Sequence, residues 1–122
     1  MATDGWDGYP AARERLLQSV QRHSPRNTVL LGGDIHQNYV CNVHAPGAGG
    51  DRPVLASEFC GTSISSRAGT TQDKVDAIAR HNPHVLLARC EERGYGLADI
   101  TPEQWTTTLR AVDNPLDPHS SA

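Results

Sequence analysis

The chain has 122 residues, with 11 basic and 14 acidic side chains and a formal net charge of −3. This length fits one domain and is sufficient to bury a core. The sequence contains no block of basic residues and no apolar run of the roughly 18 residues that a membrane span needs. It therefore gives no indication of nucleic-acid or membrane binding. The first ten residues lack the apolar segment of a signal peptide, which taken literally predicts a cytoplasmic location.

The sequence predicts two helices. The first covers residues 10–23, because Pro10 suits the first helical turn and apolar side chains recur at helical spacing, at Ala12, Leu16 and Val20. The second covers residues 72–81 and is short, because Pro83 disfavours helical geometry just before it.

Apolar, strand-like runs lie between the two helices, at residues 28–31, 39–43 and 54–59. The run at 28–31 is purely apolar after its first residue, and we expect it to form a buried strand. Residues 60–70 are small and polar, which fits either a loop beside a ligand or an ordinary connection.

Three further β-rich runs follow the second helix: "HVLLARCEE", "GYGLADIT" and "QWTTTLRAVD". Three successive strands without a helix between them predict an antiparallel meander, in which Trp105 packs into the core. Residues 114–122 are expected to be a disordered tail, which leaves residues 1–113 as the folded domain. The order of elements favours an α/β (α+β) class and fits half of a layered assembly better than a small closed fold.

The three cysteines, Cys41, Cys60 and Cys90, are far apart and form no CxxC pair. This spacing argues against a structural zinc knuckle and against a dense disulfide framework. Each lies in or beside an apolar run, so we expect three buried, inert thiols. One disulfide and one free thiol is the alternative.

The end of the first strand carries the clearest candidate for chemistry. After Gly32 and Gly33 the sequence continues with Asp34 and His36. If the strand geometry persists past Gly33, these two side chains project from the same face. A carboxylate and an imidazole together are a reasonable pair of metal ligands. The pattern is short, and a polar turn is the alternative interpretation.

Several longer motifs occur in a fixed order along the chain, and together they resemble the C-terminal portion of a PhoD-like alkaline phosphatase, within the metallophosphoesterase superfamily. The resemblance extends from Trp6 to Val112. The motifs are "DGWDGYPAARERLL", "GGDIHQNYV", "EFCGTSISS", "NPHVLLARCEERGYGLADITPEQW" and "LRAVD". The family's GDxH motif is short, but the joint match is specific.

The resemblance implies a layered β-sandwich of the metallophosphoesterase type, with flanking helices and metals at the loops that leave the sheet ends. It implies hydrolysis of phosphomonoesters, and often of phosphodiesters, by metal-activated water. Calcium and iron are the metals that it suggests, with manganese or zinc as alternatives. Full-length relatives are generally exported to the periplasm or the cell exterior, which the resemblance sets against the cytoplasmic location that the N-terminus predicts.

The resemblance also suggests site residues. Asp34 and His36 match the motif of the metal ligands, and Gly33 shapes their loop. Thr62 and Ser63 match the loop motif and are expected to line the site. His84 belongs to the "NPHV" element, where a structural hydrogen bond is the favoured role. No catalytic acid or base can be assigned.

Two departures from the family pattern concern Tyr39, where Trp is common, and Asn42, where Asp is common. The second removes a negative charge near His36. The family's upstream ligands, a cysteine, aspartates and an aspartate–histidine cluster, have no counterpart in this sequence. We therefore expect a fragment of a phosphatase that needs its missing N-terminal portion and a phosphate-ester substrate. The alternative is a non-catalytic β-rich remnant that self-associates or binds a partner.

Overall fold

The computed structural model describes residues 4–23, 26–47 and 51–121. Within these ranges a short 3₁₀ turn, η1 (Trp6–Gly8), leads into helix α1 (Pro10–His23), and a second helix, α2 (Gln72–Arg80), lies in the middle of the chain. The strands are β1 (Thr28–Gly32), β2 (Asn38–His44), β3 (Val54–Cys60), β4 (Val85–Arg89), β5 (Gly94–Ile100) and β6 (Trp105–Ala111). Both predicted helices are confirmed, and the class is mixed α+β, as expected.

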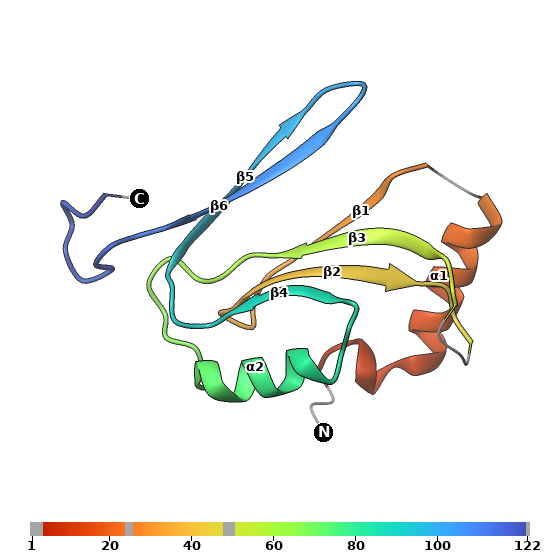
Figure 1. The fold of residues 1–122 in the computed structure, drawn as a ribbon, viewed down its shortest axis with the longest axis horizontal. Helices are drawn as coiled ribbons and strands as arrows, with labels where there is room; N and C mark the ends of the chain where they lie inside the picture. Colours follow the sequence, from red (N-terminus) through yellow and green to blue (C-terminus); the bar gives the residue numbers. More distant parts are fainter. Residues whose placement is uncertain (1–3, 24–25, 48–50, 122) are drawn as a thin grey trace.

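Four of these strands form one sheet in the order β1-β3-β2-β4 (Figure 1). β1 runs parallel to β3, whereas β2 is antiparallel to both β3 and β4. The expectation that residues 28–31 form a buried strand was wrong in one respect. β1 is an edge strand of this sheet, and Leu31 near its end is 72% exposed. A run of apolar residues marks a strand but does not show whether a neighbour covers it.

The last two strands, β5 and β6, pair with each other in an antiparallel hairpin. The predicted three-stranded meander is therefore only partly correct. β4 belongs to the other sheet, where it pairs with β2 rather than with β5. The segment between β4 and β5 contains Cys90 and Arg93, both buried, and these anchor the chain as it leaves one sheet for the other.

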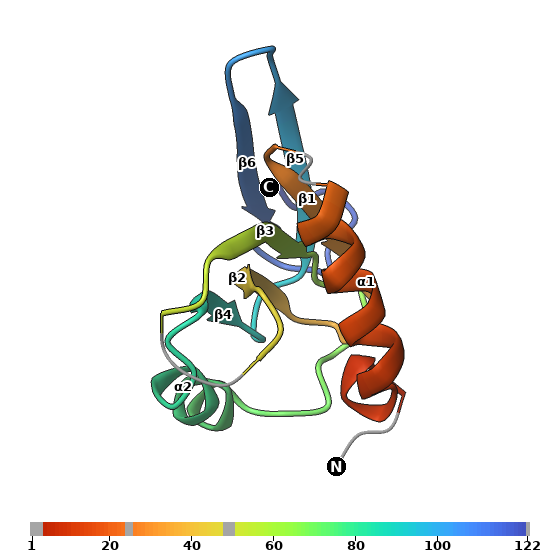
Figure 2. The same cartoon turned by 90° about the vertical axis from the view of Figure 1, so that its right-hand side faces the viewer.

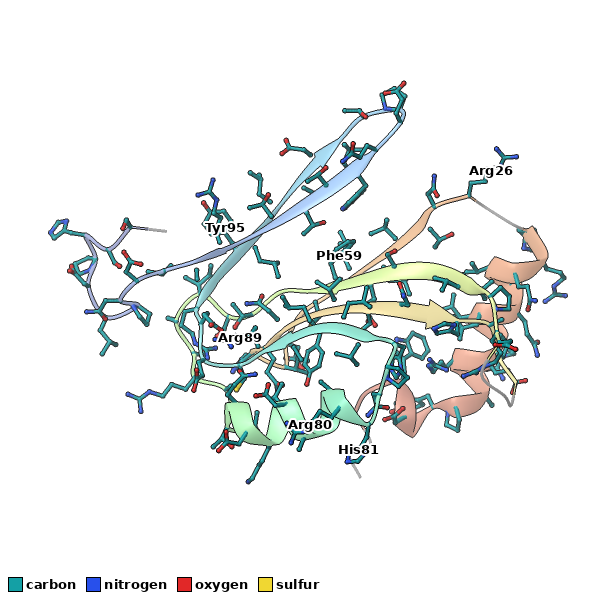
Figure 3. All side chains as sticks on the ribbon, in the orientation of Figure 1. Arg26, Phe59, Arg80, His81, Arg89 and Tyr95 are labelled. Atoms are coloured by element: carbon teal, nitrogen blue, oxygen red, sulfur yellow. The ribbon has the colours of Figure 1, made fainter. Side chains whose placement is uncertain are left out.

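The hairpin lies over the β1 and β3 side of the four-stranded sheet. Phe59 extends from β3 toward the hairpin (Figure 3), and its ring stacks on Trp105, with 6.5 Å between the ring centroids and 15° between the ring planes. A cavity of about 450 Å³ lies beside this contact. Trp105 is half-buried and does not reach the enclosed core that we expected, because the two layers touch here without closing around it.

The buried core is small and lies under α1. Leu17 of α1 packs on Val43 and Ala56 of the sheet, with Leu30 and Leu55 at the margin. Figure 2 shows α1 against the four-stranded sheet, with the hairpin extending beyond β1. Helix α2 instead lies beside β4, where the Gln72 side chain donates to the carbonyl of Ala88 and accepts from the Cys90 amide. Leu17 thus fixes α1, and α2 is held by these hydrogen bonds together with Val75, which is 1% exposed.

After β6 the chain forms hydrogen-bonded turns up to residue 121. The Asp113 amide donates to the carbonyl of Ser121, and the Asn114 amide donates to Ser120 Oγ. The boundary that we placed at residue 113 stays a prediction. Neither α1 nor α2 has the length and apolar character to span a lipid bilayer, and no other helix in the described ranges does.

Candidate functional site

The loop between β1 and β2 carries the predicted metal ligands. β1 ends at Gly32, so the extended geometry that we required for Asp34 and His36 does not persist. Both residues instead adopt left-handed backbone conformations, with φ values of 72° and 57°. Asp and His tolerate this region better than most residues, but each such position still costs about 1 kcal/mol or more. Backbone strain of this kind is concentrated at functional sites.

The imidazole of His36 is held in one orientation by a backbone carbonyl. Its Nδ1 lies 2.9 Å from the oxygen of Arg67, which can only accept a hydrogen bond. Nδ1 therefore carries the proton in the neutral ring, and the lone pair is on Nε2. Metal-ligating histidines commonly have one ring nitrogen fixed in this way. His36 is half-buried, whereas Asp34 is exposed to solvent.

Arg93 is a residue that sequence reasoning missed, although the "RGY" motif that contains it was recognised. Its side chain is buried, with 5% of its surface exposed. Nη1 donates to the carbonyl of His36 at 3.0 Å, and Nη2 donates to the carbonyl of Cys90. Nη1 also donates to the hydroxyls of Thr62 and Ser63, at 3.1 and 3.0 Å. One guanidinium therefore joins three segments that are distant in the sequence.

Thr62 and Ser63 lie beside the His36 backbone because of this arginine. Thr62 is also fixed by its amide, which donates to Oδ1 of the buried Asn38, and by its hydroxyl, which donates to the carbonyl of Glu92. Ser63 donates to the carbonyl of Ser66. The two hydroxyls are thus engaged in holding the loops together.

Gly33 and His84 lie on another side of the loop. Both line a depression of about 600 Å³ on the sheet, which Thr62 and Ser63 do not reach. The His84 side chain is exposed, and its backbone carbonyl accepts a hydrogen bond from the Asn42 amide at 2.8 Å. The structure therefore groups His36 with Thr62 and Ser63, and places Gly33 with His84.

No group of three or more His, Cys, Asp or Glu side chains within the described ranges is arranged to hold a metal ion. The cysteines do not supply further ligands in their thiol form. All three are buried and free, as we expected. Burial, together with the negative charge of Glu58, raises the pKa of Cys41 to about 11, and burial also raises the pKa values of Cys60 and Cys90. They remain protonated at neutral pH.

The raised pKa of Cys41 predicts a loss of stability at high pH. The folded state favours the protonated thiol, so this contribution is complete below the ordinary pKa of about 8.5 and is lost as the pH rises toward 11. The urea midpoint of the chain should therefore be lower at pH 10.5 than at pH 8. The decrease should be smaller in Cys41→Ala, and an equal decrease would show that other groups cause it.

Comparison with known proteins relates this chain to phosphatases. Residues 1–109 match the family model described as PhoD-like phosphatase. The chain is 36% identical over 118 residues to alkaline phosphatase D of Bacillus subtilis (strain 168), a match that covers 94% of this chain and 20% of that protein. A solved structure titled "Structure of PhoD" superposes with a TM-score of 0.85 at 34% identity, over 97% of this chain and 23% of that one.

The fold and the comparisons thus match one segment of PhoD-like phosphatases. The chain belongs to the PhoD-like phosphatase family. It spans about a fifth of the length of the Bacillus subtilis relative.

Proposed function

We propose that this chain contributes Asp34 and His36 to the metal site of a phosphatase that hydrolyses phosphate esters, and that the remaining ligands come from polypeptide beyond these residues. The observation that carries the proposal is the fixed tautomer of His36, whose Nδ1 is anchored on the Arg67 carbonyl and whose Nε2 bears the lone pair. The match to alkaline phosphatase D supports the reaction class.

The two side chains fit part of such a site. Asp34 offers a carboxylate oxygen, which calcium, manganese or iron accepts, and His36 offers a nitrogen, which suits iron or zinc better than calcium. Bound metals in phosphatases lower the pKa of a water molecule and stabilise charge on the phosphate and the leaving oxygen. The role of this chain is to hold Asp34 and His36 in place, through the left-handed loop and the Arg93 hydrogen bonds.

The other predicted residues take supporting roles in this proposal. Thr62 and Ser63 orient Arg93 and line the margin of the site, and Gly33 follows β1 at the start of the loop. The hydrogen bond at His84 is made by its backbone carbonyl, which any residue supplies, so the structural role of its side chain stays a prediction. Activity on phosphodiesters and export from the cytoplasm stay predictions.

The isolated chain should bind metal ions weakly and show no phosphatase turnover. Two protein ligands leave most coordination positions to water, so an affinity in the millimolar range is expected. Calorimetric titration with calcium, manganese and zinc tests the affinity, and a chromogenic phosphomonoester and a diester test turnover. His36→Ala should abolish what metal binding there is, whereas His81→Ala, an exposed histidine after α2, should not. Metal-dependent turnover that disappears in His36→Ala would contradict the need for outside ligands.

A second candidate is a non-catalytic module that self-associates. The observation that favours it is the set of exposed apolar side chains on β1, β4 and β5, namely Leu31, Leu86, Leu97 and Ile100. Leu31 and Leu97 line one depression between β1 and β5, whereas Leu86 lies on β4 at the other edge of the sheet. A contiguous exposed apolar surface is typical of an interface. Sedimentation velocity at increasing concentration should then show a dimer that Leu31→Lys weakens. A monomer at all concentrations would remove this candidate.

A further inference from the structure

The face of the four-stranded sheet that carries α1 is only partly covered. Side chains two apart on a strand share a face, so Tyr39 and Cys41 continue the row of Val43 on β2, and Glu58 and Cys60 continue the row of Ala56 on β3. α1 covers Val43 and Ala56 through Leu17. The rest forms the depression of about 600 Å³ described above, here called the open face, which is lined by Leu30, Tyr39, Cys41, Glu58 and Cys60, with Trp6, Leu16 and Ile35 at its margin.

Glu58 is the unusual member of this surface. It lies in the middle of β3, directly opposite Leu30 on one side and Cys41 on the other. Among the residues that the structure describes, no hydrogen-bond or ion-pair partner for its carboxylate is found. Covering this carboxylate with apolar groups alone would remove its water without replacement and would strongly disfavour docking.

The surroundings of the open face define what would cover it. The open face is lined by apolar side chains of the sheet and α1, and an amphipathic helix fits such a groove with its apolar face. A cation on that helix would offset the negative charge of Glu58 as this carboxylate loses water. The Bacillus subtilis relative has polypeptide to supply it, because this chain covers 20% of that protein.

We propose that the open face docks an apolar helix that carries one lysine or arginine opposite Glu58, and that this helix belongs to the remainder of a PhoD-like phosphatase. Docking would also cover Ile35, which is 48% exposed and lies between Asp34 and His36 in the sequence. The contact would therefore constrain the loop that carries the proposed ligands. The inference goes beyond the proposed metal chemistry and does not depend on it.

Two matched peptides test this proposal on the 122-residue chain itself. Each is a stapled helix of about 18 residues, some 27 Å long, with one apolar face. They differ at one central position of that face, which is arginine in one and glutamate in the other. Fluorescence anisotropy of the labelled peptides should show about tenfold tighter binding of the arginine peptide, which corresponds to one partly buried ion pair.

The difference between the peptides should disappear in Glu58→Gln and persist in Glu103→Gln, an exposed carboxylate between β5 and β6. Equal binding of both peptides, a difference that survives Glu58→Gln, or binding of neither at about 1 mM would overturn the proposal. Sedimentation velocity tests whether a second copy of the chain occupies the open face instead. A dimer that becomes tighter in Glu58→Gln would assign the open face to a second copy of the chain and would equally overturn it.

Discussion

Replacing Arg93 with methionine should lower the free energy of unfolding by about 3 kcal/mol or more, because buried carbonyls and hydroxyls lose a charged donor at once. The carbonyls of His36 and Cys90 and the hydroxyls of Thr62 and Ser63 all accept from this guanidinium. A domain of this size has a total stability of roughly 5–15 kcal/mol, so the loss is a large fraction of it. Urea unfolding followed by circular dichroism measures the change.

Arg110→Met is the matched control, because Arg110 lies exposed on β6 and should change stability by less than about 0.5 kcal/mol. Arg93→Lys should recover little of the loss, since a compact ammonium group cannot span acceptors on three segments. Hydrogen exchange should also show reduced protection of residues 34–38 in Arg93→Met. A variant as stable as the Arg110→Met control would contradict the assigned role of Arg93.

The helices could be predicted from the sequence because their signals are local. Pro10 and the apolar spacing after it define α1, whose observed bounds are those predicted, and the second helix ends one residue earlier than expected, at Arg80. The positions of the strands were also visible, since apolar runs mark them. Partners of strands are not local. β4 pairs with β2, a strand more than 40 residues earlier, and nothing within the β4 run itself specifies that choice.

In the candidate site, too, the sequence predicted the features with local signals and missed those that depend on distant segments. The motif identified Asp34 and His36, but their left-handed conformations depend on the turn that the loop makes after Gly32. Arg93 was missed because an arginine in a turn is ordinarily exposed. Its burial arises because two distant segments, at His36 and at Thr62, converge on the turn that carries it, and this convergence exists only in the folded chain. The family motif was the only signal in the sequence that pointed to this position.

In a full-length PhoD-like phosphatase that contains this segment, His36→Asn should lower kcat by about 100-fold or more, because loss of the metal ligand proposed here would remove several kcal/mol of transition-state stabilisation. Asparagine tolerates the left-handed backbone at this position, so the substitution adds little strain. The structural cost is mainly the hydrogen bond from Nδ1 to the Arg67 carbonyl, about 1 kcal/mol. Turnover should therefore fall much further than Tm.

The neighbouring Gln37→Ala is the control for this experiment, since Gln37 donates one hydrogen bond to the Ile35 carbonyl within the same loop. It should leave both turnover and metal content nearly unchanged. Metal content per mole of purified enzyme gives a readout that is independent of turnover, and it should fall in His36→Asn. If His36→Asn retains its full metal content and loses activity only in proportion to stability, His36 is a structural residue. The metal-ligand role would then have to be reassigned to other residues of the full-length protein, with the Arg67 contact left as the reason for the histidine at this position.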